Sequence, residues 1–196
     1  MSDPIEVLDF WLGEVGPEGW YTGGDALDAM CRVRFFDLWS AIKDGGLEHW
    51  VDGTVGTLAY IILSDQLPRN MFRGQAGSFA TDPNARRAAH LARQTGWDMQ
   101  APEPERQFFY LPFMHSEDVV DQTLSVKLFT ENMPGSGADN IIHAKAHQAV
   151  IAQFGRFPFR NPALGRSNTV EEDLFMANGA YGAIVRSIQN SYAPGA

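Results

Sequence analysis

Cysteine is almost absent from the chain, since Cys31 is the only one among 196 residues. A single cysteine excludes an internal disulfide and a cysteine-based metal site. We interpret it as a small buried hydrophobic residue on a helix. Basic residues are also few, because 15 Lys and Arg stand against 24 Asp and Glu and leave a net charge of −9. This balance argues against a nucleic acid or an anionic membrane as the main partner.

Long apolar runs are missing too, and none approaches the roughly 18 residues that crossing a bilayer requires. The first residues, Met1-Ser-Asp-Pro4, carry no basic region before an apolar stretch, so we expect no secretory signal. The chain also lacks a Gly-x-Ser-x-Gly motif, a phosphate loop and a dinucleotide fingerprint. These absences predict a cytoplasmic protein without membrane association and without a recognisable cofactor.

Alternating strand patterns are nearly absent, whereas helix starts and stops recur. Asp3-Pro4 and Asp82-Pro83 are typical helix starts, Thr169-Val-Glu-Glu172 is a capping box, and Gly155 is a typical helix end. At 44% hydrophobic, the chain can bury a substantial core. We therefore predict one all-α domain, 1–196, of about eight to ten helices packed largely as antiparallel pairs. The glycine-rich stretch 14–24 is expected to be a loop.

The segment Leu58–Leu63 is apolar on every side, which predicts a fully buried helix. Asp65 and Gln66 follow before any helix breaker, so we place them on its last turn. Pro68 lacks a donor and restricts the residue before it, so the helix is expected to end there. Charges held next to a core must be paired or must face a cavity or a ligand.

Four polar residues at this bend form the first candidate ligand-binding group: Asp65, Gln66, Arg69 and Asn70. Arginine presents a planar fork of donors that suits a carboxylate or a phosphate, and the two amides can orient a ligand. The alternative is an internal Asp–Arg pair that joins one helix end to its neighbours.

Histidines supply the candidate catalytic residues. His115 precedes a predicted helix from Ser116 to about Asn132, with Glu117 in its first turn, and a carboxylate beside a histidine can tune it for general acid–base chemistry. Plain helix capping is the alternative for the acidic residue. His143 and His147 are spaced for one helix face, but no third metal ligand is specified, so we predict no metal and expect His147 alone to meet the polar residues.

The third group, Arg156, Arg160 and Asn161, repeats the first: a helix ends, a proline bends the chain, and Arg and Asn follow. Arginines gathered in so acidic a chain predict a local positive pocket for phosphate or carboxylate. The alternative is that they pair with acidic residues such as Glu117 and Glu172 to hold the helices together.

Three long strings connect the chain to a known family: Leu63-Ser-Asp-Gln-Leu-Pro-Arg-Asn70, Tyr110-Leu-Pro-Phe-Met-His-Ser-Glu-Asp118 and Phe154-Gly-Arg-Phe-Pro-Phe-Arg-Asn161. With Val7-Leu-Asp-Phe-Trp11 and Phe79-Ala-Thr-Asp82, they resemble the bacterial family called domain of unknown function 924 over nearly the whole chain. The resemblance implies an all-helical, tetratricopeptide-like fold and brings no established activity, cofactor or catalytic residue. Two positions depart from its pattern, with Leu67 where Phe is expected and Phe159 where His is expected.

Two functions remain open at this stage. In the first, an enzyme or binder takes a small anionic metabolite, which arginines hold while His115 or His147 serves as general acid or base. In the second, a helical module takes a protein or peptide in a groove between helix pairs, and the polar groups form a structural network. The sequence favours the first slightly, because polar side chains gather at bends beside buried helices.

Overall fold

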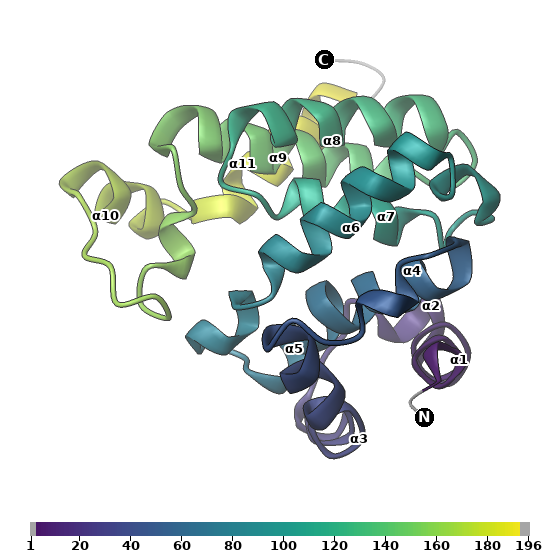
Figure 1. The fold of residues 1–196 in the computed structure, drawn as a ribbon. Helices are drawn as coiled ribbons and strands as arrows, with labels where there is room; N and C mark the ends of the chain where they lie inside the picture. The colour runs from purple at the N-terminus through teal and green to yellow at the C-terminus, as the bar shows by residue number, and fades with distance from the viewer. Residues whose placement is uncertain (1–2, 193–196) are drawn as a thin grey trace. The chain divides into compact units, whose positions relative to one another are not determined.

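Helices make up the regular structure of this computed structural model, which describes residues 3–192, and no strand occurs in that range (Figure 1). The predicted all-α class is confirmed. By its internal packing the chain divides into two compact units, Met1–Pro112 and Phe113–Ala196. A single domain over 1–196 and a tetratricopeptide-like superhelix both stay predictions.

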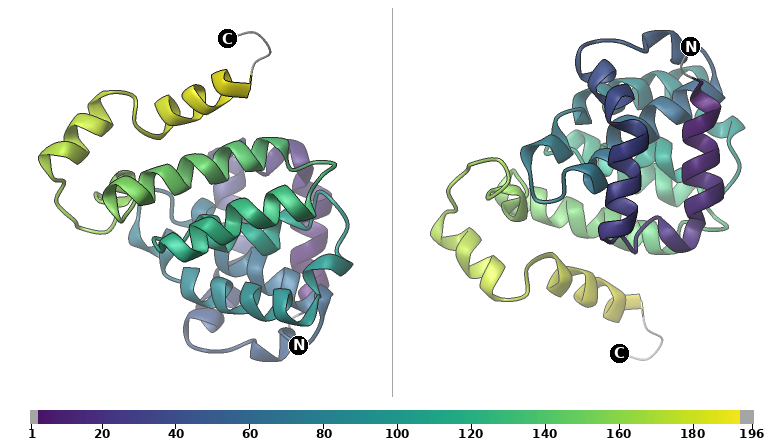
Figure 2. Two further views of the ribbon diagram at one scale, coloured as in Figure 1. Left: turned by 90° about the horizontal axis from the view of Figure 1, so that it is seen from above. Right: turned by 90° about the horizontal axis from the view of Figure 1, so that it is seen from below.

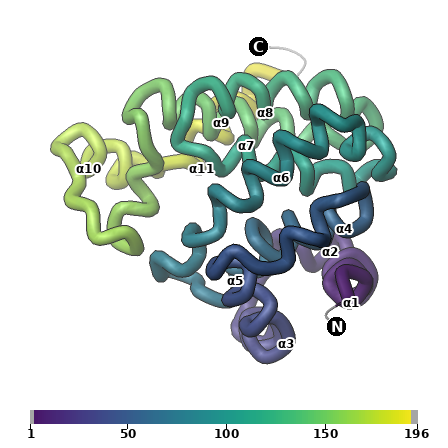
Figure 3. Tube along the Cα trace, viewed as in Figure 1, coloured from purple at the N-terminus to yellow at the C-terminus, as the bar shows by residue number. Residues whose placement is uncertain are grey.

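The first unit is built from short and medium helices, and the chain trace in Figure 3 follows their order. They are α1 (Pro4–Leu8), α2 (Gly16–Gly19), α3 (Asp25–Lys43), α4 (Thr54–Ile61), α5 (Leu67–Met71), α6 (Asp82–Thr95) and most of α7 (Gln107–Met114). Two π-helical segments, Asp9–Val15 and Ile62–Gln66, extend α1 and α4 without a break. Short 3₁₀ turns occur at Glu48–Trp50, Ala76–Phe79 and Asp98–Gln100.

Aromatic rings fill the interior of this unit. Trp20 packs edge-on against Phe108 with ring centroids 4.8 Å apart, and Phe10 lies 5.0 Å from Phe35. Trp39 and Phe72 lie 4.3 Å apart where α3 packs along α5. Such pairs add stabilisation beyond the area they bury, on the order of 1 kcal/mol each. The buried α4 packs against α1 and α6, as its apolar sequence predicted.

The second unit contains the longer helices α8 (Val119–Asn132) and α9 (Ala138–Phe154), which lie side by side (Figure 2). A short turn, Pro158–Arg160, and two further helices follow, α10 (Val170–Ala177) and α11 (Ala180–Tyr192). Tyr181 and Ile184 of α11 pack against a small core centred on Val150 and Phe157. The segment that joins α9 to α10 carries the predicted Arg156 and Arg160, and also Arg166.

Several helix ends form as their sequences predict. The Asp3 side chain accepts from the Ile5 amide at 2.9 Å, and Thr169 and Glu172 form the complete capping box. Gly155 ends α9 in the left-handed conformation that glycine adopts without strain. At α8 the cap is Asp118 rather than Ser116, because its carboxylate accepts from the amides of Val120 and Asp121.

Two expectations about where helices are interrupted were wrong. Part of the stretch 14–24 is helical, since the π segment runs to Val15 and α2 follows at Gly16–Gly19. Pro68 also does not end the central helix, because α5 begins at Leu67 and contains it. Proline is tolerated in the first turn of a helix, where its fixed backbone angle suits the helical conformation. Within residues 3–192, no helix combines the length and the apolar character that crossing a bilayer requires.

Candidate functional site

The bend at Pro68 is stabilised by a hydroxyl from another part of the first unit. A proline removes the donor that would normally reach the carbonyl four residues earlier, which here belongs to Ser64. Thr81 donates to that carbonyl at 2.6 Å and accepts from the Trp39 indole at 3.1 Å. The π-helical segment therefore passes directly into α5, and the residues on either side of Pro68 stay on one continuous helical path.

Arg69 on α5 is bound on several sides. It donates to Asp82 at 3.1 and 3.2 Å, to Asp65 at 3.3 Å and to the Ser78 carbonyl at 2.6 Å. Asp65 is fully buried, so its pairing with Arg69 meets the requirement that a buried charge be compensated. These contacts agree with the alternative of an internal Asp–Arg pair.

The side-chain amides of Gln66 and Asn70, next to this pair, are less fully hydrogen-bonded than Asp65 and Arg69 within residues 3–192. Gln66 donates through Nε2 to Asp65 and makes no other side-chain hydrogen bond among the described residues. Asn70 makes none at all with residues 3–192, although only 8% of it is exposed. Unpaired polar groups at this burial are uncommon in folded proteins and call for an explanation.

In the second unit, Glu117 fixes the turn that follows α9. Its carboxylate accepts from both terminal nitrogens of Arg166, at 2.8 and 2.9 Å, and from the Phe157 amide at 2.8 Å. Burial alone would raise the pKa of Glu117, but these hydrogen bonds outweigh it and lower the pKa below its ordinary value. Arg166 also donates to the Phe157 carbonyl at 3.1 Å, so both polar atoms of that peptide are paired.

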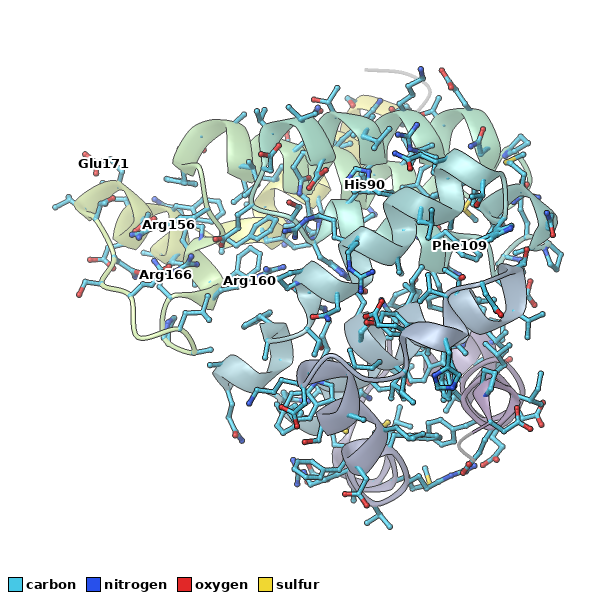
Figure 4. All side chains as sticks on the ribbon, in the orientation of Figure 1. His90, Phe109, Arg156, Arg160, Arg166 and Glu171 are labelled. Carbon is cyan, nitrogen blue, oxygen red and sulfur yellow. The ribbon has the colours of Figure 1, made fainter. Side chains whose placement is uncertain are left out.

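Asn161, Glu172 and Arg156 continue this network. Asn161 accepts from Arg166 at 2.8 Å and donates to Glu172 at 3.3 Å, and it is fully buried. Arg156 binds Glu172 through two hydrogen bonds of 2.6 and 2.7 Å, which lower the pKa of Glu172 to about 2. Figure 4 labels Arg156, Arg160 and Arg166 along the segment between α9 and α10. Arg156 and Arg166 each bind a carboxylate of their own unit.

A cluster of histidines and aromatic rings lies on the other side of Phe157. We call His115, His147, Phe157, Arg160 and Tyr181 the histidine–aromatic cluster. The His147 ring lies 6.3 Å from His115, 5.2 Å from Phe157 and 4.7 Å from Tyr181, measured between ring centroids. The Arg160 guanidinium lies 4.4 Å from the centre of the Phe157 ring.

The protonation of His147 follows from its contacts. Its Nδ1 lies 2.9 Å from the His143 carbonyl, which can only accept, so Nδ1 carries the proton and Nε2 carries a lone pair. Burial lowers the pKa of His147 to about 3, and the charges of His115 and Arg160 add to the effect. His147 is therefore neutral at physiological pH, and its Nε2 can accept a hydrogen bond.

His115 is positioned by a buried glutamine that is not among the predicted site residues. Gln122 on α8 donates to the carbonyls of Met114 at 2.7 Å and Ser116 at 2.6 Å, on either side of the histidine. Tyr181 was missed as well, although its hydroxyl forms a 2.6 Å hydrogen bond with Nδ1 of His143. No local signal marks Tyr181, because its role depends on how α11 packs. Among residues 3–192, no three His, Cys, Asp or Glu side chains are grouped to hold a metal ion.

The predicted site residues thus fall into three groups. Asp65, Gln66, Arg69 and Asn70 lie together at the bend in the first unit. Glu117, Arg156 and Asn161 belong to the paired network of the second unit, and His115, His147 and Arg160 to the histidine–aromatic cluster.

Comparison with known proteins agrees with the family resemblance that the sequence motifs indicated. The bacterial family of unknown function DUF924 matches residues 7–180. The chain belongs to this family. A solved structure of a protein of unknown function, ATU0120 from Agrobacterium tumefaciens, is similar at 38% identity and a TM-score of 0.83, covering 90% of this chain and 97% of that one. No curated protein matches the sequence. Family and neighbour therefore support the helical fold and leave the activity to be argued from the side chains.

Proposed function

We propose that the protein binds a small anionic molecule, a phosphate or a carboxylate, at the histidine–aromatic cluster. Arg160 supplies the charge, since it is 7% exposed and its guanidinium lies against an aromatic ring. Arginine in such surroundings is weakly hydrated and binds oxyanions well. The cytoplasm remains the predicted compartment, and a metabolite of that compartment the predicted ligand.

The observation that carries this proposal is the state of His147. A neutral imidazole with its lone pair on Nε2 accepts a hydrogen bond from a ligand hydroxyl or from a protonated phosphate. Its pKa of about 3 is too low for a general base near neutral pH. If the protein is an enzyme, His147 orients the substrate and His115, 6.3 Å away, is the candidate acid or base.

Charge linkage gives this proposal a direct test. The positive charges near His147 help to lower its pKa, so an anion bound beside them raises it. We would follow the histidine ring resonances by NMR during titration with inorganic phosphate and with citrate. The expected result is a higher His147 pKa in the presence of one of these anions, together with a raised melting temperature.

The matched variants are Arg160→Gln and Lys127→Gln, which each remove one positive charge from the second unit. Lys127 is exposed on α8 and forms only a 3.9 Å surface pair with Glu131. The anion effect is expected to persist in Lys127→Gln and to disappear in Arg160→Gln. An unchanged His147 pKa with both anions, or equal effects in the two variants, would contradict the proposal.

A second candidate, the peptide-binding module, is favoured by a hollow elsewhere in the same unit. This hollow of about 580 Å³ lies between the end of α9 and the start of α10, and Phe154, Arg156 and Glu171 contribute to its lining. Val170 and Leu174 are exposed on α10. A fluorescent basic peptide that binds wild type and not Glu171→Lys would support this candidate, whereas equal binding would count against it.

A further inference from the structure

The two amides at the bend in the first unit remain outside both candidate functions. Gln66 ends the π-helical segment Ile62–Gln66, and Asn70 lies four residues later on α5, one helical turn away. Residues four apart on a helix lie on the same face. They are 6% and 8% exposed, respectively. Single π-helical turns inserted in longer helices are found frequently at functional sites.

Their unused hydrogen-bonding capacity is specific. Gln66 gives one donor to Asp65 and leaves its Oε1 acceptor without a partner among the described residues. Asn70 leaves both its carbonyl oxygen and its amide nitrogen unpaired within residues 3–192. The unpaired polar atoms of Gln66 and Asn70 are not wholly excluded from solvent, so each side chain retains some contact with it.

The orientation of Gln66 is set by a chain of contacts. Its Nε2 is held by Asp65, Asp65 is held by Arg69, and Arg69 is held in turn by Asp82. Such support behind a binding group reduces the cost of ordering it when a ligand arrives. The acceptor oxygen of Gln66 therefore has a fixed orientation before a ligand binds.

The charges around these amides select the kind of ligand. The two terminal nitrogens of Arg69 are already occupied by the carboxylates of Asp65 and Asp82 and by a carbonyl. An anion at these amides would lie beside two carboxylates, with the Arg69 guanidinium already bound to them. A neutral group that presents a donor beside an acceptor complements an Asn and Gln pair, because each amide offers both.

We propose that Gln66 and Asn70 form a binding site for a neutral carboxamide group. The site accepts the amide N–H of the ligand on a side-chain oxygen and donates from Asn70 to its carbonyl oxygen. It is built from other residues than the anion site proposed above, so either proposal can fail without the other.

The test uses two probes that differ in one group, nicotinamide and nicotinate. We would record the side-chain NH₂ signals of the full-length protein by ¹H–¹⁵N NMR during titration with each. Nicotinamide is expected to shift the NH₂ pairs of Gln66 and Asn70 in a saturable way, and nicotinate is expected to leave them in place.

Three variants complete the design: Asn70→Leu and Gln66→Met, which keep side-chain size, and Gln75→Met at an exposed loop position in the same unit. The first two are expected to weaken nicotinamide binding at least tenfold, and the third to leave it unchanged. The same signals from the remaining amide report whether each variant is folded. The proposal is overturned if nicotinamide moves neither NH₂ pair, if nicotinate moves them equally, or if folded Asn70→Leu binds as wild type does.

Discussion

Asn70 and Asn161 occupy equivalent places in a repeated pattern and have different surroundings. Each directly follows an arginine, and a proline lies two or three residues before it. Both are buried, at 8% and 0% exposure. Asn161 donates to Asn168 at 2.7 Å and accepts from Arg166 at 2.8 Å, whereas Asn70 has no side-chain partner among residues 3–192.

The difference shows that a polar motif at a bend predicts that its asparagine is buried. It does not predict whether that asparagine completes a structural network. The partners of Asn161 arrive five to eleven residues later, from the loop and the capping box that begin α10. After Asn70 the chain continues into Arg73 and an exposed turn, and Arg73 pairs with Asp28 on α3 instead. One asparagine completes a network, and the other is left with unused donors and acceptors.

The sharpest test of this comparison is Asn161→Leu, for which we expect the largest loss of stability. The buried Glu172 and the partly buried Arg166 would each lose a hydrogen bond, and unpaired groups of this kind cost about 3 kcal/mol together. For a chain of this size that corresponds to a fall in melting temperature of roughly 6–12 °C. Urea unfolding measures the change. A loss below about 1 kcal/mol would mean that the network contributes little.

The fold was largely predictable because helix signals are local. Asp3, Thr169 and Gly155 mark helix ends through side chains or backbone angles within a few residues. Pro68 misled the prediction because the group that compensates for it, Thr81, lies on a different segment. Long-range partners of this kind leave no trace in the local pattern.

Thr81→Val tests that compensation and is expected to have the second largest effect. The variant removes the donor to the Ser64 carbonyl and the acceptor for the Trp39 indole. We expect a loss of about 2 kcal/mol in the free energy of unfolding. Thr95→Val is the control, since the Thr95 hydroxyl bonds only to carbonyls of its own helix. Equal losses in both variants would contradict the role of Thr81 in stabilising the bend.

The sequence predicted which residues belong to the candidate sites, but it did not predict which of them lie together. The sequence identified His147 and Arg160, and the electrostatic effect of Arg160 on His147 depends on how the turn after α9 folds. Tyr181 could not be predicted from the sequence, because nothing local indicates that α11 packs along α9. Glu117 was predicted beside a histidine, and its carboxylate is bound by Arg166 and the Phe157 amide.

The third prediction concerns pH and His147. Its pKa is about 3 in the folded protein and 6.5 ordinarily, so the unfolded chain binds more protons between these values. Stability is therefore lost as the pH falls below about 6.5, by up to roughly 2 kcal/mol at pH 5 from this residue. His147→Phe keeps a ring against Phe157 and Tyr181 and removes the titration. Urea unfolding of both proteins from pH 8 to 5 is expected to show the shallower pH dependence in the variant, and parallel curves would contradict it.

The smallest effect is expected for Asn70→Leu, and its direction matters more than its size. Because the Asn70 amide has no partner within the described residues, replacing it with an apolar side chain of similar volume removes no hydrogen bond. Sites kept for binding often trade stability for function, so the variant is expected to be as stable as wild type or more stable by up to about 1 kcal/mol. Thermal and urea unfolding beside Asn161→Leu make the comparison direct. If the two variants lost stability equally, Asn70 would be part of the scaffold in the way Asn161 is, and the contrast between the two bends would lose its meaning.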